Sequence, residues 1–308
     1  MLTSPRMFKL ILRLASIAVL SAAAAPSPAA VVLTDDAGGQ IAFAQPPARI
    51  VSLAPHITEL MFAAGAGSHL IAADEYSDYP PAAKKLPRIG NAHALDLETM
   101  LALKPDLVIA WKSGTDSRQL ARLHEMGIRI FLSEPRSLED IPRTIETFGR
   151  LAGTEAQASA AAAKLRARAA ALAERYSRRP PVRVFVEIWS PPIMTVNRDH
   201  LIDAVLHLCG GENVFGALGT LTPTVTLESV VAADPQVIIA NDVGNERPAF
   251  LDAWQRWPHL SAVEHDLVTW IPADLIARPG PRIFDAAAQA CEIIDRARDA
   301  SSRGNKQP

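Results

Sequence analysis

An internal repeat constrains the fold of this chain more than any other feature. The segment LETMLALKPDLVIA at 97–110 aligns without gaps on LESVVAADPQVIIA at 227–240, an offset of 130 residues. In both copies a short helical pattern ends at a proline and a buried strand follows. Solenoid repeats have shorter periods, so this offset predicts two similarly built lobes, with chance similarity of helix–proline–strand units as the alternative.

Strand and helix patterns alternate on both sides of one long helix. Residues 154–177 contain no Gly or Pro and are rich in Ala, Leu, Arg and Glu, which favours a helix about 36 Å long. Thr154 and Gln157 fit a capping box. A long surface helix within one domain is the alternative to a connection between two lobes.

The length of 308 residues also favours two domains. We therefore expect an α/β fold with two lobes, parallel-rich central sheets, one joining helix and a ligand cleft between the lobes. The predicted boundaries are an N-terminal lobe at 31–152 that begins with a hairpin, a linking helix at 153–179, a C-terminal lobe at 180–300 and a disordered tail at 301–308.

The N-terminus has the pattern of a secretory signal peptide over 1–25. A basic region with Arg6, Lys9 and Arg13 precedes an apolar run and a string of alanines that offers an A-x-A cleavage site. A membrane anchor is the alternative, although the apolar run is short for a span. We expect a mature protein that is exported to the periplasm and soluble.

The net charge and the cysteine content limit the kinds of partner and the cellular compartment that suit this protein. With 31 Lys and Arg against 33 Asp and Glu the net charge is −2, which argues against a nucleic-acid or anionic-membrane partner. In an oxidising compartment the two cysteines, Cys209 and Cys291, suggest one disulfide, with two buried thiols as the alternative. The sequence contains no C-x-x-C motif that would indicate a metal site.

Aromatic residues gather in the loops predicted to line the cleft. Only 6% of residues are aromatic, yet Tyr76, Trp111 and Trp189 follow or flank predicted strands, where clefts of α/β proteins bind ligands. Flat rings suit a large, partly apolar, planar ligand. The alternative is that Tyr76 and Trp111 only cover the surface of their lobe.

Signatures of enzymes are absent from the sequence. It contains no GxSxG elbow, P-loop or complete GxGxxG. His56 and His93 fall in predicted cleft loops and are weak candidates for metal ligation, since a lone loop histidine is more often solvated. We expect no catalytic residues, no cofactor and no resident metal.

Two glutamates occupy matching positions in the repeat. Glu98 and Glu228 each lie two residues after a helix-capping residue, Asp96 or Thr226. Each carboxylate could simply complement the positive end of its helix. Alternatively, the pair forms two anionic knobs that dock on basic sockets of a pseudo-symmetric membrane partner.

The motifs RIVSLAP–TEL, YSDYPP, ALKPDLVIAW, CGGENVF and D–R–PRI resemble those of the periplasmic substrate-binding proteins of ABC importers for cobalamin, haem and iron–siderophores, the helical-backbone class. The resemblance covers nearly the whole mature chain and is strongest to the cobalamin-binding members. It implies capture of a corrinoid and delivery to an ABC permease by a protein that we expect to be a monomer.

The resemblance also implies roles for particular residues. Tyr76, Trp111, Asp274 and Arg278 fall on positions that touch the corrinoid, and the position of the family's aromatic contact in the first loop of the second lobe falls near Ile188 or Trp189. It pairs Cys209 with Cys291 in a disulfide and gives Glu98 and Glu228 the role of binding permease arginines.

The sequence departs from this family at two cleft positions. Ala92 and Thr222 stand where tryptophans are expected, which removes apolar contact area and suggests another corrinoid or weaker binding. A haem ligated by His56, His93 or Tyr76, or a ferric siderophore, is the second hypothesis. A secreted α/β hydrolase is a third, but it lacks a candidate nucleophile–base pair.

Overall fold

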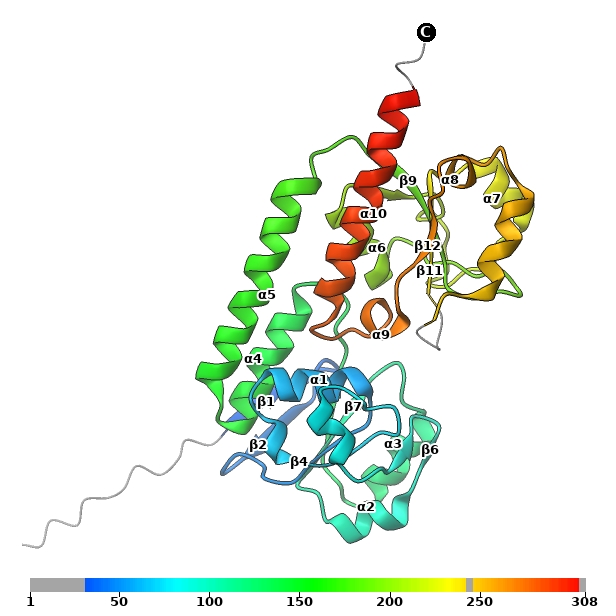
Figure 1. Ribbon diagram of the computed structural model, residues 1–308. Helices are drawn as coiled ribbons and strands as arrows, with labels where there is room; N and C mark the ends of the chain where they lie inside the picture. Colours follow the sequence, from blue (N-terminus) through cyan, green and yellow to red (C-terminus); the bar gives the residue numbers. More distant parts are fainter. Residues whose placement is uncertain (1–30, 242–245, 305–308) are drawn as a thin grey trace, which may run out of the picture.

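The computed structural model describes residues 31–241 and 246–304. Figure 1 shows two α/β lobes, with the N-terminal lobe below and the C-terminal lobe above. The predicted signal peptide at 1–25 lies outside the described residues. Of the helices described, none is both long enough and apolar enough to cross a membrane.

The N-terminal lobe begins with the predicted antiparallel hairpin of β1 (Val31–Thr34) and β2 (Gln40–Phe43). Its main sheet is parallel, in the order β4-β3-β7-β8, with strands β3 (Ile50–Ser52), β4 (Leu70–Ala73), β7 (Leu107–Trp111) and β8 (Ile130–Ser133). The other elements are α1 (Pro55–Ala63), η1 (Gly67–His69), η2 (Pro81–Lys85), the small pair β5 (Gly90–Asn91) and β6 (Ala94–Leu95), α2 (Leu97–Leu103), α3 (Ser117–Glu125) and α4 (Asp140–Ala152).

The C-terminal lobe contains a second parallel sheet in the order β10-β9-β11-β12. Its strands are β9 (Val182–Glu187), β10 (Gly211–Asn213), β11 (Val237–Ala240) and β12 (Val268–Trp270). Its helices are α6 (Leu201–Leu208), α7 (Leu227–Ala233), η3 (Ala249–Arg256), α8 (Ser261–Glu264), α9 (Ala273–Ile276) and α10 (Ile283–Gly304).

The two sheets share one topology, which explains the internal repeat. In both, the first strand of the lobe's main sheet lies between the second and the third, and the fourth is at the far edge. The matching helices α2 and α7 both end in a left-handed residue, Lys104 (φ 45°) or Asp234 (φ 41°), directly before the repeated proline. Arg49 and Arg183 then donate to the carbonyl groups at these two helix ends.

Each sheet buries both faces, as parallel sheets do. Ile50 and Val184 point toward one large apolar core that runs through both lobes, whereas their neighbours Val51 and Phe185 point into separate cores on the opposite faces. Because successive side chains of a strand point to opposite faces of the sheet, each strand contributes alternately to the core shared by both lobes and to a core within its own lobe.

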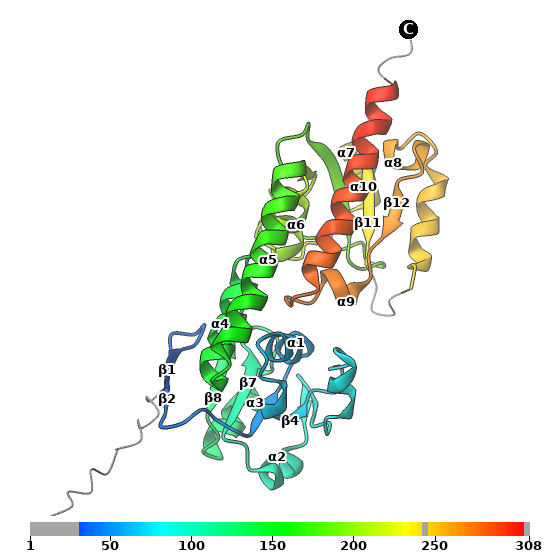
Figure 2. The same cartoon turned by 60° about the vertical axis from the view of Figure 1, so that its left-hand side comes forward.

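The long helix is α5 (Glu155–Tyr176), slightly shorter than the predicted 153–179. In Figures 1 and 2 it runs from the side of α4 in the lower lobe to α10 and α6 in the upper lobe. The predicted capping box is wrong. Thr154 makes no cap hydrogen bond and instead donates its hydroxyl to the Ala64 carbonyl at the end of α1, at 2.7 Å.

The C-terminal end differs from the prediction. Helix α10 continues to Gly304, so residues 301–304 are helical where a disordered tail was expected. Ser301 receives a hydrogen bond of 2.7 Å from Gln236, which ties the last turn to the C-terminal lobe. Residues 305–308 lie outside the described residues.

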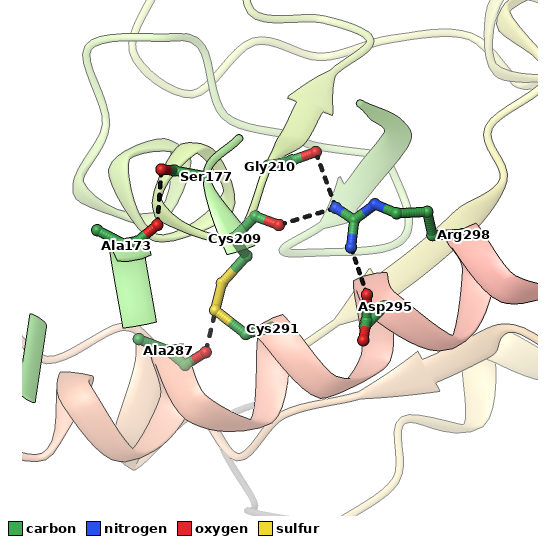
Figure 3. The surroundings of a disulfide bond; sticks show 8 residues. All are labelled: Ala173, Ser177, Cys209, Gly210, Ala287, Cys291, Asp295 and Arg298. Carbon is green, nitrogen blue, oxygen red and sulfur yellow. Dashed lines mark hydrogen bonds and ion pairs between the residues drawn. A yellow bond between two sulfur atoms is a disulfide. The ribbon is translucent and has the colours of Figure 1, made fainter. Parts of the chain in front are cut away.

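The disulfide between Cys209 and Cys291 is present and joins α10 to the end of α6. Figure 3 shows that Arg298 reinforces this junction: its guanidinium donates to the Cys209 and Gly210 carbonyls and to Asp295. Both cysteines are fully buried, so the bond fastens the terminal helix from inside the core.

Candidate ligand-binding site

A cavity of about 330 Å³ lies between the lobes. Trp111, the last residue of β7, and Glu134, which follows β8, lie at the carboxyl ends of two parallel strands, where ligands of α/β proteins bind. The cavity is lined by Trp111, Ser113, Glu134, Pro135 and Arg136 from the N-terminal lobe and Asp199, His200, Leu201, Leu221, Ile276, Ala277 and Pro279 from the C-terminal lobe.

Trp111 is half-buried at the wall of this cavity. Its ring meets the His56 ring edge to face, with centroids 5.1 Å apart. Gly114 makes this position possible, because a Cβ there would stand 1.9 Å from an indole carbon. The WKSG turn therefore holds the indole in place and leaves part of it open to a ligand.

Arg278 joins the two lobes through carboxylates. Its guanidinium donates to Asp78 at 2.8 Å and to Glu59 at 3.3 Å in the N-terminal lobe, and it pairs with Asp274 at 2.5 Å in its own lobe. Arg282, four residues further on, donates to both oxygens of Glu59 at 2.9 and 2.7 Å. We call these five residues the Arg278 cluster.

Glu59 and Arg282 were not predicted as site residues, although both lie within the motifs TEL and PRI. Glu59 stands within the apolar run ITELMF and is 3% exposed, so it needs buried partners. Gly280 lies directly against this pair, since a Cβ there would be in van der Waals contact with Glu59 and His56. A lone carboxylate in an apolar helix was the available signal.

The other predicted aromatic contacts are exposed. Tyr76 is 58% exposed and lies two residues before Asp78, so its loop borders the Arg278 cluster. Trp189 is 49% exposed and donates its indole N–H to the Pro191 carbonyl. Neither is among the described residues that line the cavity between the lobes, whereas Trp111 and the segment around Arg278 are brought together there.

The two candidate histidines differ in environment. His56 was predicted to lie in a loop, but it lies in the first turn of α1 and is 2% exposed. Burial, with a smaller effect of Arg278, lowers its pKa to about 3, so it is neutral. His93 is exposed. Among the residues described, no group of three or more His, Cys, Asp or Glu side chains could hold a metal ion.

Glu98 and Glu228 are equivalent in structure as well as in sequence. Each is an exposed second residue of a seven-residue helix, α2 or α7, whose N-cap side chain, Asp96 or Thr226, accepts the expected backbone hydrogen bond. The two corners therefore present the same local surface. Ala92 is half-buried and Thr222 is exposed, so neither supplies an apolar wall.

Glu187, the last residue of β9, makes the stability of the C-terminal lobe depend on pH. Burial raises its pKa from 4.5 to about 7, although a 2.8 Å hydrogen bond from Trp254 opposes the shift. The folded state thus holds this proton more tightly than the unfolded state. The contribution of the protonated Glu187 to the free energy of unfolding is therefore fully present below about pH 4.5. It is lost as the pH rises through about 7.

We therefore expect the Glu187→Gln variant to lose less stability than the wild type between about pH 5 and about pH 8, by on the order of 2–3 kcal/mol. Urea denaturation at both pH values measures this. His56 acts in the opposite direction, because its pKa is lowered, but it is present in both proteins and cancels in the difference. Identical pH profiles would contradict the prediction.

Comparison with known proteins agrees with this architecture. A family model for periplasmic binding proteins matches residues 50–275. The vitamin B12-binding protein of Vibrio cholerae serotype O1 is 38% identical over 249 residues, which cover 81% of this chain and 90% of that protein. That of Photorhabdus laumondii is 37% identical over 249 residues, covering 81% and 88%.

Solved structures extend the similarity to the fold. The periplasmic vitamin B12 binding protein BtuF of Vibrio cholerae matches with a TM-score of 0.74 and 38% identity over 82% of this chain and 98% of that one. The periplasmic heme-binding protein RhuT of Roseiflexus sp. RS-1 matches with a TM-score of 0.70 and 26% identity over 81% and 98%. Because the family model spans most of the sequence and the relatives are similar along nearly their whole length, this chain belongs to the periplasmic binding protein family.

Proposed function

We propose that this protein captures cobalamin or a related corrinoid in the periplasm and delivers it to an ABC permease in the membrane. The observation that carries the proposal is the 38% identity to a vitamin B12-binding protein along 90% of that protein. The cavity between the lobes supplies a place for the ligand. As expected, the chain is a binding protein rather than an enzyme, so no bond of the ligand is made or broken.

The geometry of the cleft supports a proposed set of ligand contacts. Trp111 supplies a ring face at the cavity wall. The exposed Tyr76 and Trp189 are proposed as further aromatic contacts, since their rings are open to a ligand. Asp274 and Arg278 bind the side-chain amides of the corrin ring. Such contacts would suit a ligand with an apolar plane and a polar rim.

Titration calorimetry with cyanocobalamin and with haemin tests the proposal. We expect heat with cyanocobalamin, and we expect Trp111→Ala to weaken binding by about 1–3 kcal/mol, because apolar contact area is lost. Trp257→Ala is the matched control, since this indole is exposed, lies near the end of α7 and is not among the described residues that line the cavity between the lobes. If no corrinoid produces heat, the proposal is wrong.

Haem is the second candidate ligand, because a heme-binding protein is among the structural neighbours at 26% identity. Of the residues suggested as axial ligands, His56 is buried, whereas His93 and Tyr76 are exposed. Haem binding would thus shift the Soret band of haemin in the wild type and not in the double variant Tyr76→Phe with His93→Ala. Failure of cyanocobalamin to compete with haemin would favour this function over the first.

We further propose that Glu98 and Glu228 dock on basic sockets of the permease. Both are exposed at equivalent corners of the two lobes, so a partner with matching symmetry can engage both together. The protein would act as a monomer in this complex, which light scattering of the purified protein can check.

The docking role predicts a specific loss. The double variant Glu98→Ala with Glu228→Ala should lower transport into vesicles that contain the permease by about tenfold or more, because two charge pairs at an interface disappear together. Ligand affinity should stay unchanged. The control replaces two other exposed glutamates, Glu125 and Glu174, with alanine. Equal transport by both double variants would rule out docking through Glu98 and Glu228.

A further inference from the structure

Three carboxylates surround Arg278, one of the proposed ligand contacts. Asp78 and Glu59 approach its Nη1 from the N-terminal lobe and Asp274 approaches its Nη2 from the C-terminal lobe. The second guanidinium of the Arg278 cluster, Arg282, is engaged with Glu59. Two guanidiniums therefore face three carboxylates, and the ionised cluster has a net charge of −1.

The cavity wall does not reverse this balance. Its described lining contains Arg136, which lies 3.8 Å from Glu134, together with Asp199. His200 also lines the cavity, and burial lowers its pKa, which favours the neutral ring. Along this lining, carboxylates thus outnumber guanidiniums, as they do in the Arg278 cluster.

We propose that the Arg278 cluster makes the cleft select ligands that carry neutral carboxamide side chains over similar macrocycles that carry free carboxylates. This inference rests on the proposed function and deepens it. A carboxamide offers a carbonyl oxygen to the guanidinium of Arg278 and an NH₂ group to a neighbouring carboxylate, so both partners are satisfied. A ligand carboxylate offers only acceptors and repels the carboxylates already present.

Asp78 is the residue of the cluster best placed to enforce this choice. Its side chain is 49% exposed, whereas Glu59 is 2% and Asp274 is 19% exposed. Its side chain therefore stays accessible while one of its oxygen atoms accepts a hydrogen bond from Arg278. Removal of its charge leaves the cluster neutral and less repulsive to an anion.

A pair of matched corrinoids tests the inference. Dicyanocobinamide carries peripheral amides, and dicyanocobyrinic acid carries carboxylic acids at the same ring positions. We expect the wild type to bind the amide form about tenfold or more tightly than the acid form at neutral pH. Asp78→Asn should reduce this ratio severalfold, mainly through tighter binding of the acid form, and Asp274→Asn should act in the same direction.

Asp252→Asn is the control, because it removes a carboxylate from an exposed ion pair with Arg247, outside the cluster. Circular dichroism of each variant checks the fold, and the wild-type ratio tests the inference even if a variant does not fold. A wild-type ratio near one, or a ratio that neither Asp78→Asn nor Asp274→Asn changes, would overturn the inference and leave corrinoid binding intact.

The failure of the proposed function would be distinct. If the wild type binds no corrinoid, that function is wrong, and haemin is then compared with its dimethyl ester, which lacks the ionised propionates. Tighter binding of the ester would support selection against carboxylates by the Arg278 cluster. Equal or tighter binding of haemin would overturn it.

Discussion

Replacement of Glu59 by glutamine is expected to lower the free energy of unfolding by about 3–5 kcal/mol, as when one partner of a buried ion pair is removed. Glu59 is 3% exposed and accepts hydrogen bonds from both Arg278 and Arg282. Its loss leaves two guanidiniums, 17% and 16% exposed, without the carboxylate that faces both. Chemical denaturation measures the change.

Glu139→Gln provides a matched control for this prediction. Glu139 pairs with Arg166 at 2.7 Å, but its side chain is 63% exposed. Water already screens this pair, so its removal should cost less than about 1 kcal/mol. If the two variants lost equally little stability, Glu59 would not be a buried tether between the lobes.

Because Glu59 lies in α1 and its partners Arg278 and Arg282 lie just before the start of α10, the same variant should also loosen the second connection between the lobes. The first connection, α5, is unaffected. We therefore expect small-angle scattering of Glu59→Gln to show a modestly larger radius of gyration, with Glu139→Gln unchanged. Gly280 packs against α1 between the two arginines, so it is part of this second connection.

Reduction of the Cys209–Cys291 disulfide is expected to lower the free energy of unfolding by on the order of 4 kcal/mol in the chain-entropy account. The two cysteines are 82 positions apart, so the bond closes a long loop in the unfolded chain. Urea denaturation of the oxidised and the reduced protein compares identical side chains and avoids an added cavity.

The double variant Cys209→Ala with Cys291→Ala should be insensitive to reductant, which separates the disulfide from other effects of the reagent. A thiol assay must show that the wild-type bond has been reduced. If it has, and the denaturation midpoint does not move, the bond contributes little. The carbonyl contacts of Arg298 would then hold α10 in place by themselves.

The repeat was visible in sequence because its elements follow local rules. The pattern of a capping residue, two turns of helix, a proline and a buried strand needs only neighbours along the chain, and it recurs at 97–110 and 227–240. The structure gives both copies the same left-handed end and the same place in their sheets. The long helix was likewise evident from its composition.

The ends of elements were less predictable. Thr154 had the sequence of a cap but lies next to an orphan carbonyl at the end of α1, which takes its hydroxyl. Residues 301–304 were predicted to be disordered, yet they are helical, and Gln236 donates a hydrogen bond to Ser301 in this last turn. In both cases a partner distant in sequence decided the outcome.

Local sequence was sufficient for the α/β class, the two lobes and the joining helix, because periodicity and helix propensity carry that information. The presence of only two cysteines suggested a disulfide but left two buried thiols as an alternative. The Arg278 cluster was not accessible in this way. Its ion pairs between the lobes join residues 200 to 223 positions apart, and only the packing of α1 against the segment before α10 brings their charges within reach. Burial and electrostatics depend on such distant neighbours, so they were decided by the tertiary fold.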